Sequence, residues 1–447
     1  MEKKIFRKHP NCYTGETEGL GYAFVPGNKA GIVVLDLKSK RMLDDPFGIK
    51  QGVDDQRLGL LLKKGLVLDG DTKLTFGCRL SESRVRNFGV WLHVTNACNL
   101  RCPYCYIKKD GATMSLETAK TFIDKLEVTV ERHGIDSLTI RFAGGEPMLR
   151  VELVKKLSQE INLRFAPKGV RVAFVLITNG TLMDSVRVSL VKEYNMRLCI
   201  SLDGVKEWHN KTRSFPSGKG TFERVWSGIQ LCQREGLQPM ILSTITKDNL
   251  GGLEELNRLL VDSGLRFRYG VYRDVDGGYQ GYKEFNLKLT EVLSRCYIYY
   301  EDAIRSGKAT FNHQLADLRI DTNRHLRCCN IGHSGVSVKD NGAIFLCQSR
   351  MNKDSIGTVW DQATFLEMVQ NQQVLPDAKR EDVRDYSHCA QCQWALTCGG
   401  GCPVVKQDTY GTIATASPYC ELFKMFIPRL VELRALSLIK TFQRKGG

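Results

Sequence analysis

The sequence of 447 residues has no run of 18 or more apolar residues, so we predict that it has no transmembrane helix. Residues 1–10 are charged and no apolar stretch follows them, so we expect no secretory signal peptide. Internal repeats and low-complexity segments are also missing. These absences predict a globular, cytoplasmic protein, and the length allows two or three domains of ordinary size.

Sixteen cysteines are typical of disulfides only in a small secreted domain, and this chain is predicted to be neither small nor secreted. Metal ligation is therefore the better interpretation. The cysteines form two dense groups, three at 98–105 and eight at 328–420. The five others are scattered along the chain: Cys12, Cys78, Cys199, Cys232 and Cys296. Cys199 lies in an apolar run, which favours an ordinary core position.

The formal net charge of the chain is +15. The simplest interpretation is a solvated basic surface. Nucleic-acid binding is a second interpretation, but no module for it is visible in the sequence, and we expect no nucleic-acid partner. A basic groove for an acidic peptide is the third.

After residue 86, short apolar runs rich in Val, Ile and Leu alternate with helical stretches. The apolar runs are Val90–Thr95, Ser137–Ala143, Arg171–Thr178, Arg197–Asp203, Gln238–Thr246 and Phe267–Arg273. The candidate helices between and after them cover 115–132, 151–164, 184–194, 220–235, 250–264 and 284–305. Six such β/α units predict an α/β fold, a partial (β/α)6 parallel barrel. In such folds the function lies on loops at the carboxyl ends of the strands.

Two regions of different composition flank these units. Residues 310–420 are rich in Cys and Gly, with short strands at Gly335–Val338 and Ala343–Leu346, and an amphipathic helix is expected at 421–442. The first 85 residues predict a small α+β unit with extended segments at Gly31–Leu35 and Arg41–Leu43 and a helix at 54–64. We therefore expect an N-terminal unit at 1–85, the partial barrel at 86–309, and a cysteine-rich iron–sulfur domain at 310–447.

The first dense group has the spacing C-x3-C-x2-C, formed by Cys98, Cys102 and Cys105, and no fourth cysteine follows nearby. Three thiolates on one loop can hold three irons of a [4Fe–4S] cluster and leave the fourth iron open for a small molecule. A zinc knuckle is the alternative. With Tyr104 just before the last cysteine, the triplet resembles the signature of the radical S-adenosylmethionine (SAM) enzymes.

This resemblance implies that SAM binds the open iron and is cleaved to a 5′-deoxyadenosyl radical, with the three cysteines and Asp203 as catalytic residues. The segment Gly144-Gly145-Glu146-Pro147 follows the second predicted strand and looks like the GGEP motif of the family. Its backbone carbonyls and its carboxylate are expected to receive the ammonium group of SAM. A structural turn is the alternative.

Four further residues resemble positions of the family that line the SAM pocket. Asn179 follows the third predicted strand, and Ser201 and Asp203 lie at the end of the fourth. The resemblance implies that Asn179 and Ser201 hydrogen-bond SAM, that Asp203 orients SAM or the substrate, and that Arg213 binds the SAM carboxylate. A helix cap, a turn and a surface ion pair are the structural alternatives. Tyr104 belongs to the same expected cofactor site.

The second dense group has a long spacing pattern: Cys329-x12-Gly342-x4-Cys347, then Cys389-x2-Cys392-x5-Cys398-x3-Cys402, then Cys420, with Cys328 directly before Cys329. It resembles the SPASM extension of radical SAM enzymes that modify peptides and proteins, which implies two further [4Fe–4S] clusters, three in all. The family's ligation implies an outer cluster on Cys389, Cys392, Cys398 and Cys420. It implies an inner cluster on Cys347, Cys402 and one or both of Cys328 and Cys329.

The favoured hypothesis is a maturase that abstracts hydrogen from a residue of a ribosomally made precursor peptide or of a protein, giving a crosslink, an oxidation or a backbone rearrangement. A sulfatase-type maturase that forms formylglycine is the runner-up. A multi-cluster electron carrier and a zinc-dependent nucleic-acid binder are the hypotheses from other classes. The expected partners are a precursor peptide, bound by a reduced winged-helix-like element at 20–70, and a reductant such as flavodoxin or ferredoxin; no membrane is expected.

Overall fold

The structure is a computed structural model that describes residues 4–69, 84–273, 280–318, 320, 325–379 and 382–446. Cys78 lies outside the described residues. No helix among the described residues is long and apolar enough to cross a membrane.

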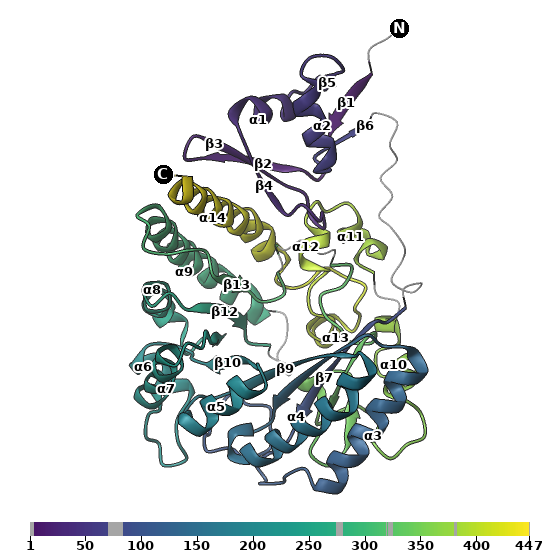
Figure 1. Cartoon of the computed structure of the whole chain (residues 1–447). Coiled ribbons are helices and arrows are strands. Elements are labelled where there is room, and N and C mark those ends of the chain that lie inside the picture. Colours follow the sequence, from purple (N-terminus) through teal and green to yellow (C-terminus); the bar gives the residue numbers. More distant parts are fainter. Residues whose placement is uncertain are drawn as a thin grey trace.

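A ten-stranded sheet forms the centre of the described structure (Figure 1). Its strands are β7 (Asn87–His93), β8 (Ser137–Ala143), β9 (Arg171–Thr178), β10 (Arg197–Ser201), β11 (Met240–Ile245), β12 (Arg266–Val271), β13 (His313–Leu315), β14 (Gly335–Val338), β15 (Ala343–Phe345) and β16 (Ser355–Thr358). The order across the sheet is β13-β12-β11-β10-β9-β8-β7-β14-β15-β16. Strands β7 to β13 pair in parallel, as the six apolar runs predicted for β7 to β12.

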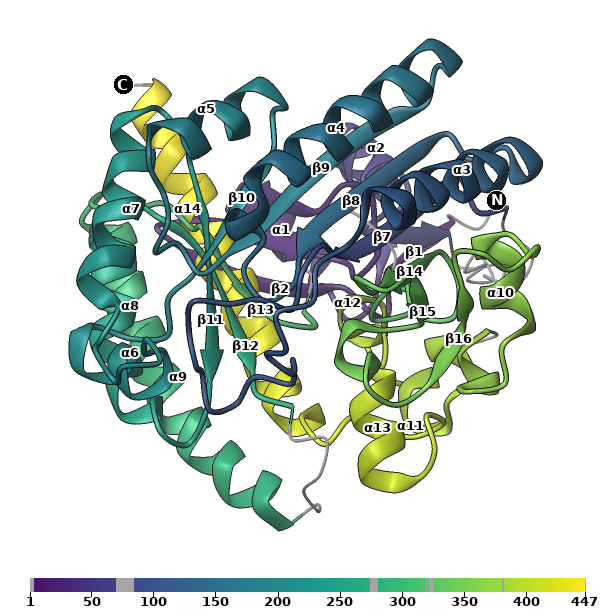
Figure 2. The same ribbon diagram turned by 90° about the horizontal axis from the view of Figure 1, so that it is seen from below.

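Helices connect the parallel strands and follow the outer side of the sheet (Figure 2). They are α3 (Leu116–His133), α4 (Val151–Phe165), α5 (Ser185–Glu193), α6 (Lys206–Thr212), α7 (Phe222–Arg234), α8 (Leu253–Asp262) and α9 (Gln280–Arg305). Helix α3 begins at the predicted N-cap, where the Ser115 side chain accepts a hydrogen bond from the Thr118 N–H. It ends at Gly134, whose φ of 57° is a left-handed conformation that glycine adopts without strain.

The N-terminal residues form two three-stranded antiparallel sheets, β5-β1-β6 and β2-β3-β4. Their elements are β1 (Ile5–Lys8), β2 (Tyr13–Thr17), β3 (Leu20–Phe24), β4 (Ile32–Leu35), α1 (Leu37–Leu43), β5 (Ile49–Lys50), α2 (Asp55–Lys63) and β6 (Val67–Asp69). The predicted helix at 54–64 is confirmed as α2. The extended segment predicted at Arg41–Leu43 is wrong: these residues end α1, because the Asp36 side chain caps that helix by accepting from the Ser39 N–H.

The cysteine-rich region after residue 310 joins both edges of the central sheet, through β13 beside β12 and β14 beside β7. The predicted short strands at 335–338 and 343–346 correspond to β14 and β15. Its helices are α10 (Phe365–Asn371), α11 (Ser387–Ala390), α12 (Ala395–Cys398), α13 (Pro403–Tyr410) and α14 (Cys420–Gly446). The last of these is the terminal helix expected at 421–442.

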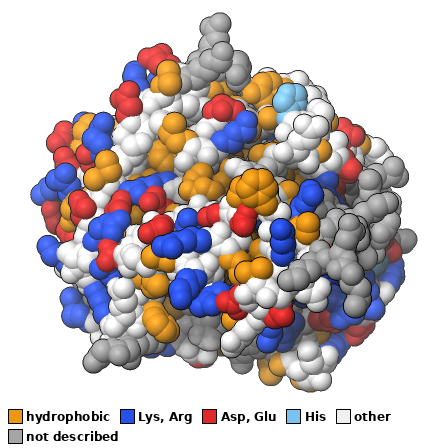
Figure 3. Space-filling view, turned by 90° about the horizontal axis from the view of Figure 1, so that it is seen from above, with side chains coloured by type: hydrophobic (Ala, Val, Ile, Leu, Met, Phe, Trp, Pro, Cys, Tyr) orange, Lys and Arg blue, Asp and Glu red, His pale blue; other side chains and the backbone are white. Residues whose placement is uncertain are grey.

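Helix α14 packs between the N-terminal strands and the rest of the chain (Figure 1). It contacts β2, β3 and β4 on one side and α9 on the other. Tyr22 and Phe24 of β3 are buried and belong to the same apolar core as the central sheet, and Glu18 pairs with Arg305 and Lys440. On the face seen from the N-terminal side, Lys and Arg side chains are interspersed with acidic and apolar ones (Figure 3).

Candidate active site at the carboxyl ends of the parallel strands

The loop that carries the first three cysteines follows β7 and is held in place by the neighbouring strand end. The Gly145 N–H donates to the Thr95 carbonyl at 2.7 Å and the Glu146 N–H donates to the Ala97 carbonyl at 2.8 Å. A Cβ atom on Gly144 would lie 2.4 Å from the Thr95 carbonyl oxygen, and one on Gly145 would lie 2.1 Å from that of Ala97. Only glycine therefore allows this turn to pack on the start of the cysteine loop.

The three thiols of the first dense group are neighbours. Burial raises the pKa of Cys98 and of Cys102. The nearby thiols of Cys98 and Cys105 contribute to the raised pKa of Cys102. Two N–H donors point at sulfur: the Leu100 N–H lies 3.4 Å from the Cys98 Sγ, and the Lys109 Nζ lies 3.1 Å from the Cys105 Sγ. Three adjacent thiols with donors directed at sulfur suit the ligation of an anionic iron–sulfur cluster.

Glu146 joins the ends of β8 and β9. Its carboxylate is fully buried and accepts hydrogen bonds from the Met148 N–H at 3.0 Å, the Thr178 hydroxyl at 2.7 Å and the Asn179 N–H at 2.7 Å. Burial raises the pKa of Glu146 despite these donors. Three donors from the chain itself satisfy most of this carboxylate, so its observed role is to align the two strand ends.

Asn179 connects the end of β9 to the cysteine loop. Its Nδ2 donates to the Asn99 side chain at 2.8 Å and lies 4.0 Å from the Cys98 Sγ. Its Oδ1 accepts from the Thr181 N–H and hydroxyl at 3.0 and 2.7 Å. Ser201, the last residue of β10, is half-buried at the same edge. The structure thus places Asn179 beside the cysteine loop, and Ser201 at the carboxyl end of the neighbouring strand.

Asp203 gathers donors from three elements. Its Oδ2 accepts from the Tyr104 hydroxyl and, at 2.7 Å, from the Arg213 Nε, and its Oδ1 accepts from the Thr244 N–H at 2.9 Å. The Asp203 side chain is fully buried and that of Arg213 is 12% exposed. The guanidinium also lies 5.6 Å from the centre of the Tyr104 ring. These bonds fix the cysteine loop, β11 and the segment before α7 relative to one another.

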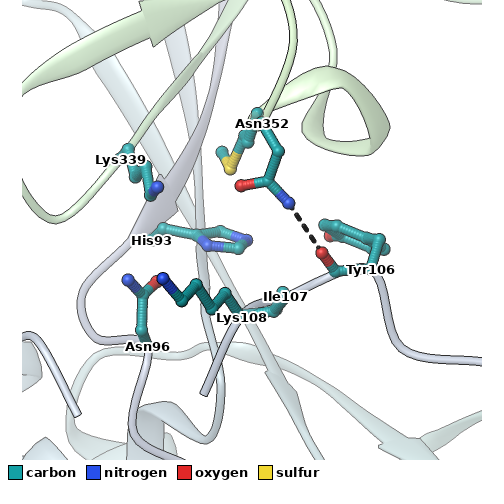
Figure 4. Close-up of a pocket in the computed structure, with 8 residues that line it drawn as sticks. His93, Asn96, Tyr106, Ile107, Lys108, Lys339 and Asn352 are labelled. Atoms are coloured by element: carbon teal, nitrogen blue, oxygen red, sulfur yellow. Dashed lines mark hydrogen bonds between the residues drawn. The ribbon is translucent and has the colours of Figure 1, made fainter. Parts of the chain in front are cut away.

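A small pocket lies between the cysteine loop and the cysteine-rich region (Figure 4). His93 and Tyr106 line it from one side and Lys339 and Asn352 from the other. The Asn352 Nδ2 donates to the Tyr106 carbonyl at 2.8 Å. Burial lowers the pKa of His93 to about 3, so its imidazole is neutral at physiological pH. The pocket shows that the two dense cysteine groups lie on adjoining parts of the molecule.

The second dense group separates into two sets of thiols. We call Cys389, Cys392, Cys398 and Cys420 the outer thiol group. Cys392 and Cys420 both contribute to the raised pKa of Cys389 and of Cys398. We call Cys328, Cys347 and Cys402 the inner thiol group, because Cys402 contributes to the raised pKa of Cys328, and Cys347 contributes to the raised pKa of Cys402. Cys328 is buried and its neighbour Cys329 is more exposed. The assignment of these two groups to an outer and an inner cluster remains a prediction.

Sequence reasoning missed two cations that donate to sulfur. One is Lys109, four residues after Cys105, and the other is Arg273, which follows β12 and donates to the Cys402 Sγ at 3.1 Å. The spacing from Cys105 to Lys109 is a signal present in the sequence. No local signal marks Arg273, because 129 positions separate it from Cys402.

Comparison with known proteins identifies the class. Residues 92–260 match the radical SAM superfamily. The chain contains a radical SAM domain. A radical SAM enzyme uses a [4Fe–4S] cluster and SAM, and the matched residues include the cysteine loop, the Gly144–Pro147 turn, Asn179, Asp203 and Arg213.

Relatives of this chain include a sulfatase-maturating enzyme and a cyclopropyl synthase. A cysteine-type anaerobic sulfatase-maturating enzyme of Clostridium perfringens is 23% identical over 362 residues, 76% of this chain and 96% of its own. The radical SAM cyclopropyl synthase TigE of Paramaledivibacter caminithermalis is 21% identical over 433 residues, 89% of this chain and 87% of its own.

Two solved structures share the fold of this radical SAM chain. The sulfatase maturase anSMEcpe, with bound AdoMet and the Cp18Cys peptide, has a TM-score of 0.61 and 21% identity, and the match covers 78% of this chain and 99% of that one. SuiB of Streptococcus suis, bound to the precursor peptide SuiA, has a TM-score of 0.52 and 15% identity, and the match covers 93% and 98%.

Proposed function

We propose that this chain is a radical SAM maturase that modifies a residue of a ribosomally made precursor peptide. The observation that carries the proposal is the radical SAM match over residues 92–260 together with the two thiol groups of the cysteine-rich region. When bound, the cluster and SAM supply an organic radical that abstracts hydrogen from the substrate. Relatives named as a cyclopropyl synthase and as a peptide-bound SuiB support a peptide substrate.

In this proposal Cys98, Cys102 and Cys105 hold the SAM cluster, and the strand ends around them hold SAM. The half-buried backbone at Gly144–Gly145 receives the ammonium group of SAM, because the neighbouring Glu146 carboxylate already accepts from Thr178 and Asn179. Ser201 at the end of β10 and Asn179 at the end of β9 contribute polar contacts to the cofactor. These assignments rest on the position of each residue at the carboxyl edge of the parallel strands.

Asp203 and Arg213 are positioning residues in this proposal. Asp203 holds Tyr104 and Arg213 at once, and the remaining guanidinium N–H groups of Arg213 are available to a carboxylate such as that of SAM. The same ion pair keeps the charged guanidinium stable in a buried place.

The outer and inner thiol groups are proposed to hold two auxiliary [4Fe–4S] clusters in a SPASM domain, with a flavodoxin- or ferredoxin-like protein as reductant. Four thiols are enough for a complete ligand set of one such cluster. The three-thiol SAM site leaves an iron open for the cofactor, which favours an enzyme over a pure electron carrier. A cytoplasmic location fits this oxygen-sensitive chemistry and is part of the same proposal.

A formylglycine-forming sulfatase maturase is the second candidate function. The anaerobic sulfatase maturase of Clostridium perfringens matches this chain over 96% of its own length, which supports it. The SuiB match extends over 93% of this chain, compared with 78% for anSMEcpe. The additional coverage favours a substrate that needs the N-terminal unit, such as a precursor peptide with a leader.

One experiment separates these functions. The reconstituted enzyme is incubated anaerobically with SAM and dithionite and with one of two peptides: the product of a short reading frame beside the gene, or a sulfatase-derived peptide containing Cys. Mass spectrometry of the first peptide is expected to show a modification that depends on Cys102. An aldehyde on the sulfatase peptide alone would establish the second function instead.

A further inference from the structure

Arg273 reaches from the central sheet to the inner thiol group. It lies two residues after the end of β12, at the same edge of the sheet as the cysteine loop. Its Nη1 donates to the Cys402 Sγ at 3.1 Å, and its Nη2 donates to the Asp317 Oδ1 at 2.6 Å. One guanidinium therefore bridges the carboxylate that follows β13 and a thiol of the inner thiol group.

The charge of Arg273 is shared among several anionic or potentially anionic groups. Asp317, Cys402, Cys328 and Cys347 all raise the pKa of Arg273 well above its usual value. All three members of the inner thiol group thus lie within the electrostatic reach of this cation. The segment is fixed on its other side, because the Tyr419 hydroxyl donates to the Tyr272 carbonyl at 3.2 Å.

Asp317 holds Arg273 from a backbone conformation that side chains rarely adopt. Its φ is 67°, a left-handed value that residues other than glycine adopt infrequently. The Asp317 side chain is 12% exposed and that of Arg273 is 30% exposed, so the ion pair is partly buried. The Asp317 carboxylate contacts a cation that itself contacts a thiol of the inner thiol group, so both charges lie next to these sulfur atoms.

We propose that Arg273 and Asp317 form a positioning pair that sets the reduction potential of an iron–sulfur cluster on the inner thiol group. The inference rests on the proposed function, because that function places the cluster on Cys328, Cys347 and Cys402. Arg273 stabilises the reduced cluster, and Asp317 limits how much positive charge the cluster experiences. The pair also links the cluster to the end of β12, where the substrate side of the sheet begins.

The sign of each effect follows from electrostatics. Reduction transfers one electron from dithionite to a cluster that is already anionic, so a cation beside a ligand sulfur favours the reduced form and raises the potential. A nearby carboxylate has the opposite effect. Removing the charge of Arg273 must therefore lower the potential, and removing the charge of Asp317 must raise it.

The test uses the full-length, reconstituted protein with Cys98, Cys102 and Cys105 replaced by Ala, so that the SAM cluster does not contribute to the spectra. Potentiometric titration with dithionite, followed by EPR, gives the midpoint potential of each remaining cluster. Adding Cys402→Ala identifies the signal of the inner cluster. Arg86→Gln is the matched control. Arg86 also pairs with an aspartate, Asp136, at 3.1 Å, but this pair is exposed to solvent.

We expect Arg273→Gln to lower the inner potential so that the reduced-to-oxidised ratio at a fixed potential falls about tenfold, which is about 59 mV for one electron. We expect Asp317→Asn to raise it, and Arg273→Lys and Arg86→Gln to leave it near the starting value. Unchanged potentials in both Arg273→Gln and Asp317→Asn, or shifts of the same sign, would overturn the proposal, since a merely structural pair gives no opposite shifts.

Iron content separates the remaining outcomes. If Cys402→Ala removes no iron and no signal, the proposed inner cluster itself is wrong. If Arg273→Gln loses the inner iron, the other two variants decide. A raised potential in Asp317→Asn together with an unchanged potential in Arg273→Lys supports the proposal. Any other pair of results overturns it.

Discussion

The hydroxyl of Tyr104 donates a hydrogen bond to the carboxylate of Asp203, although the two residues lie 99 positions apart in the chain. Tyr104 stands between Cys102 and Cys105 on the cysteine loop, and Asp203 follows the end of β10. This bond therefore sets where the three thiols lie relative to the sheet. Arg213 shares the same carboxylate oxygen, so a single buried anion orients both a ring and a guanidinium.

Replacing Asp203 is expected to cost more stability than replacing Tyr104. Asp203→Asn leaves the largely buried Arg213 without its counter-charge, a loss of about 3–5 kcal/mol, whereas Tyr104→Phe removes one hydrogen bond to a charged group, about 1.5–3 kcal/mol. Urea unfolding measures both. Tyr299→Phe is the matched control, because its hydroxyl donates to Asp262 at an exposed site. Equal, small losses in all three variants would contradict the central role of Asp203.

The iron content should follow the three thiol groups. The ligand count predicts about twelve irons in protein reconstituted without oxygen. Replacing Cys98, Cys102 and Cys105 with Ala should remove about four of them, because the triplet lies on its own loop. Colorimetric iron and sulfide assays give the numbers, and a loss of all the iron or of none would contradict separate clusters.

SAM cleavage should depend on the triplet more than on the outer thiol group. In the proposed function electrons would reach SAM through a cluster held by the cysteine loop, so Cys102→Ala is expected to abolish 5′-deoxyadenosine formation. Cys392→Ala is expected to lose mainly peptide modification, with some loss of stability because a removed metal ligand also costs folding energy. Chromatography quantifies 5′-deoxyadenosine. The same loss of cleavage in well-folded samples of both variants would disprove this division.

Removing residues 1–83 should impair peptide capture rather than SAM cleavage. The truncation deletes buried Tyr22 and Phe24 and uncovers one side of α14, so we also expect a lower thermal stability. Fluorescence anisotropy of a labelled precursor peptide compares the affinity of the two forms, and the net basic charge predicts binding that weakens with salt. Undiminished affinity in a soluble truncation would place recognition elsewhere.

The unfolding free energy should decrease as the pH falls from about 7 to 5, partly because of His313. Burial among aromatic rings lowers the pKa of His313 from 6.5 to about 3. Below pH 6.5 the histidine binds a proton in the unfolded state but stays neutral in the folded state. The free energy of unfolding therefore decreases by about 1.4 kcal/mol per pH unit for each such histidine. His313→Gln should reduce this slope in pH-dependent unfolding, and an unchanged slope would show that other groups cause it.

The sequence by itself determined the parallel sheet and the radical SAM loop. Strands buried on both faces must be apolar, so the apolar runs before Gly144 and Asn179 could be predicted as the strands β8 and β9. The cysteine triplet could be recognised in the sequence because its three residues lie on one short loop, in a spacing that resembles the radical SAM signature. Two local predictions failed. Arg41–Leu43 is helical rather than extended, because Asp36 caps α1. Strand β13 was not predicted, because it is only three residues long.

Only the tertiary structure decided which charges meet. In the folded chain Tyr104 and Arg213 both donate to the Asp203 carboxylate. The Asn179 N–H, at the end of β9, donates to Glu146, and Arg273 donates to the Cys402 Sγ. Each of these contacts joins residues from different loops, and their sequence separations carry no pattern that a reader of the chain could detect. The physical reason is that parallel strands gather their carboxyl ends at one edge of a sheet, while the partners of a buried charge are selected by packing and desolvation across the whole fold.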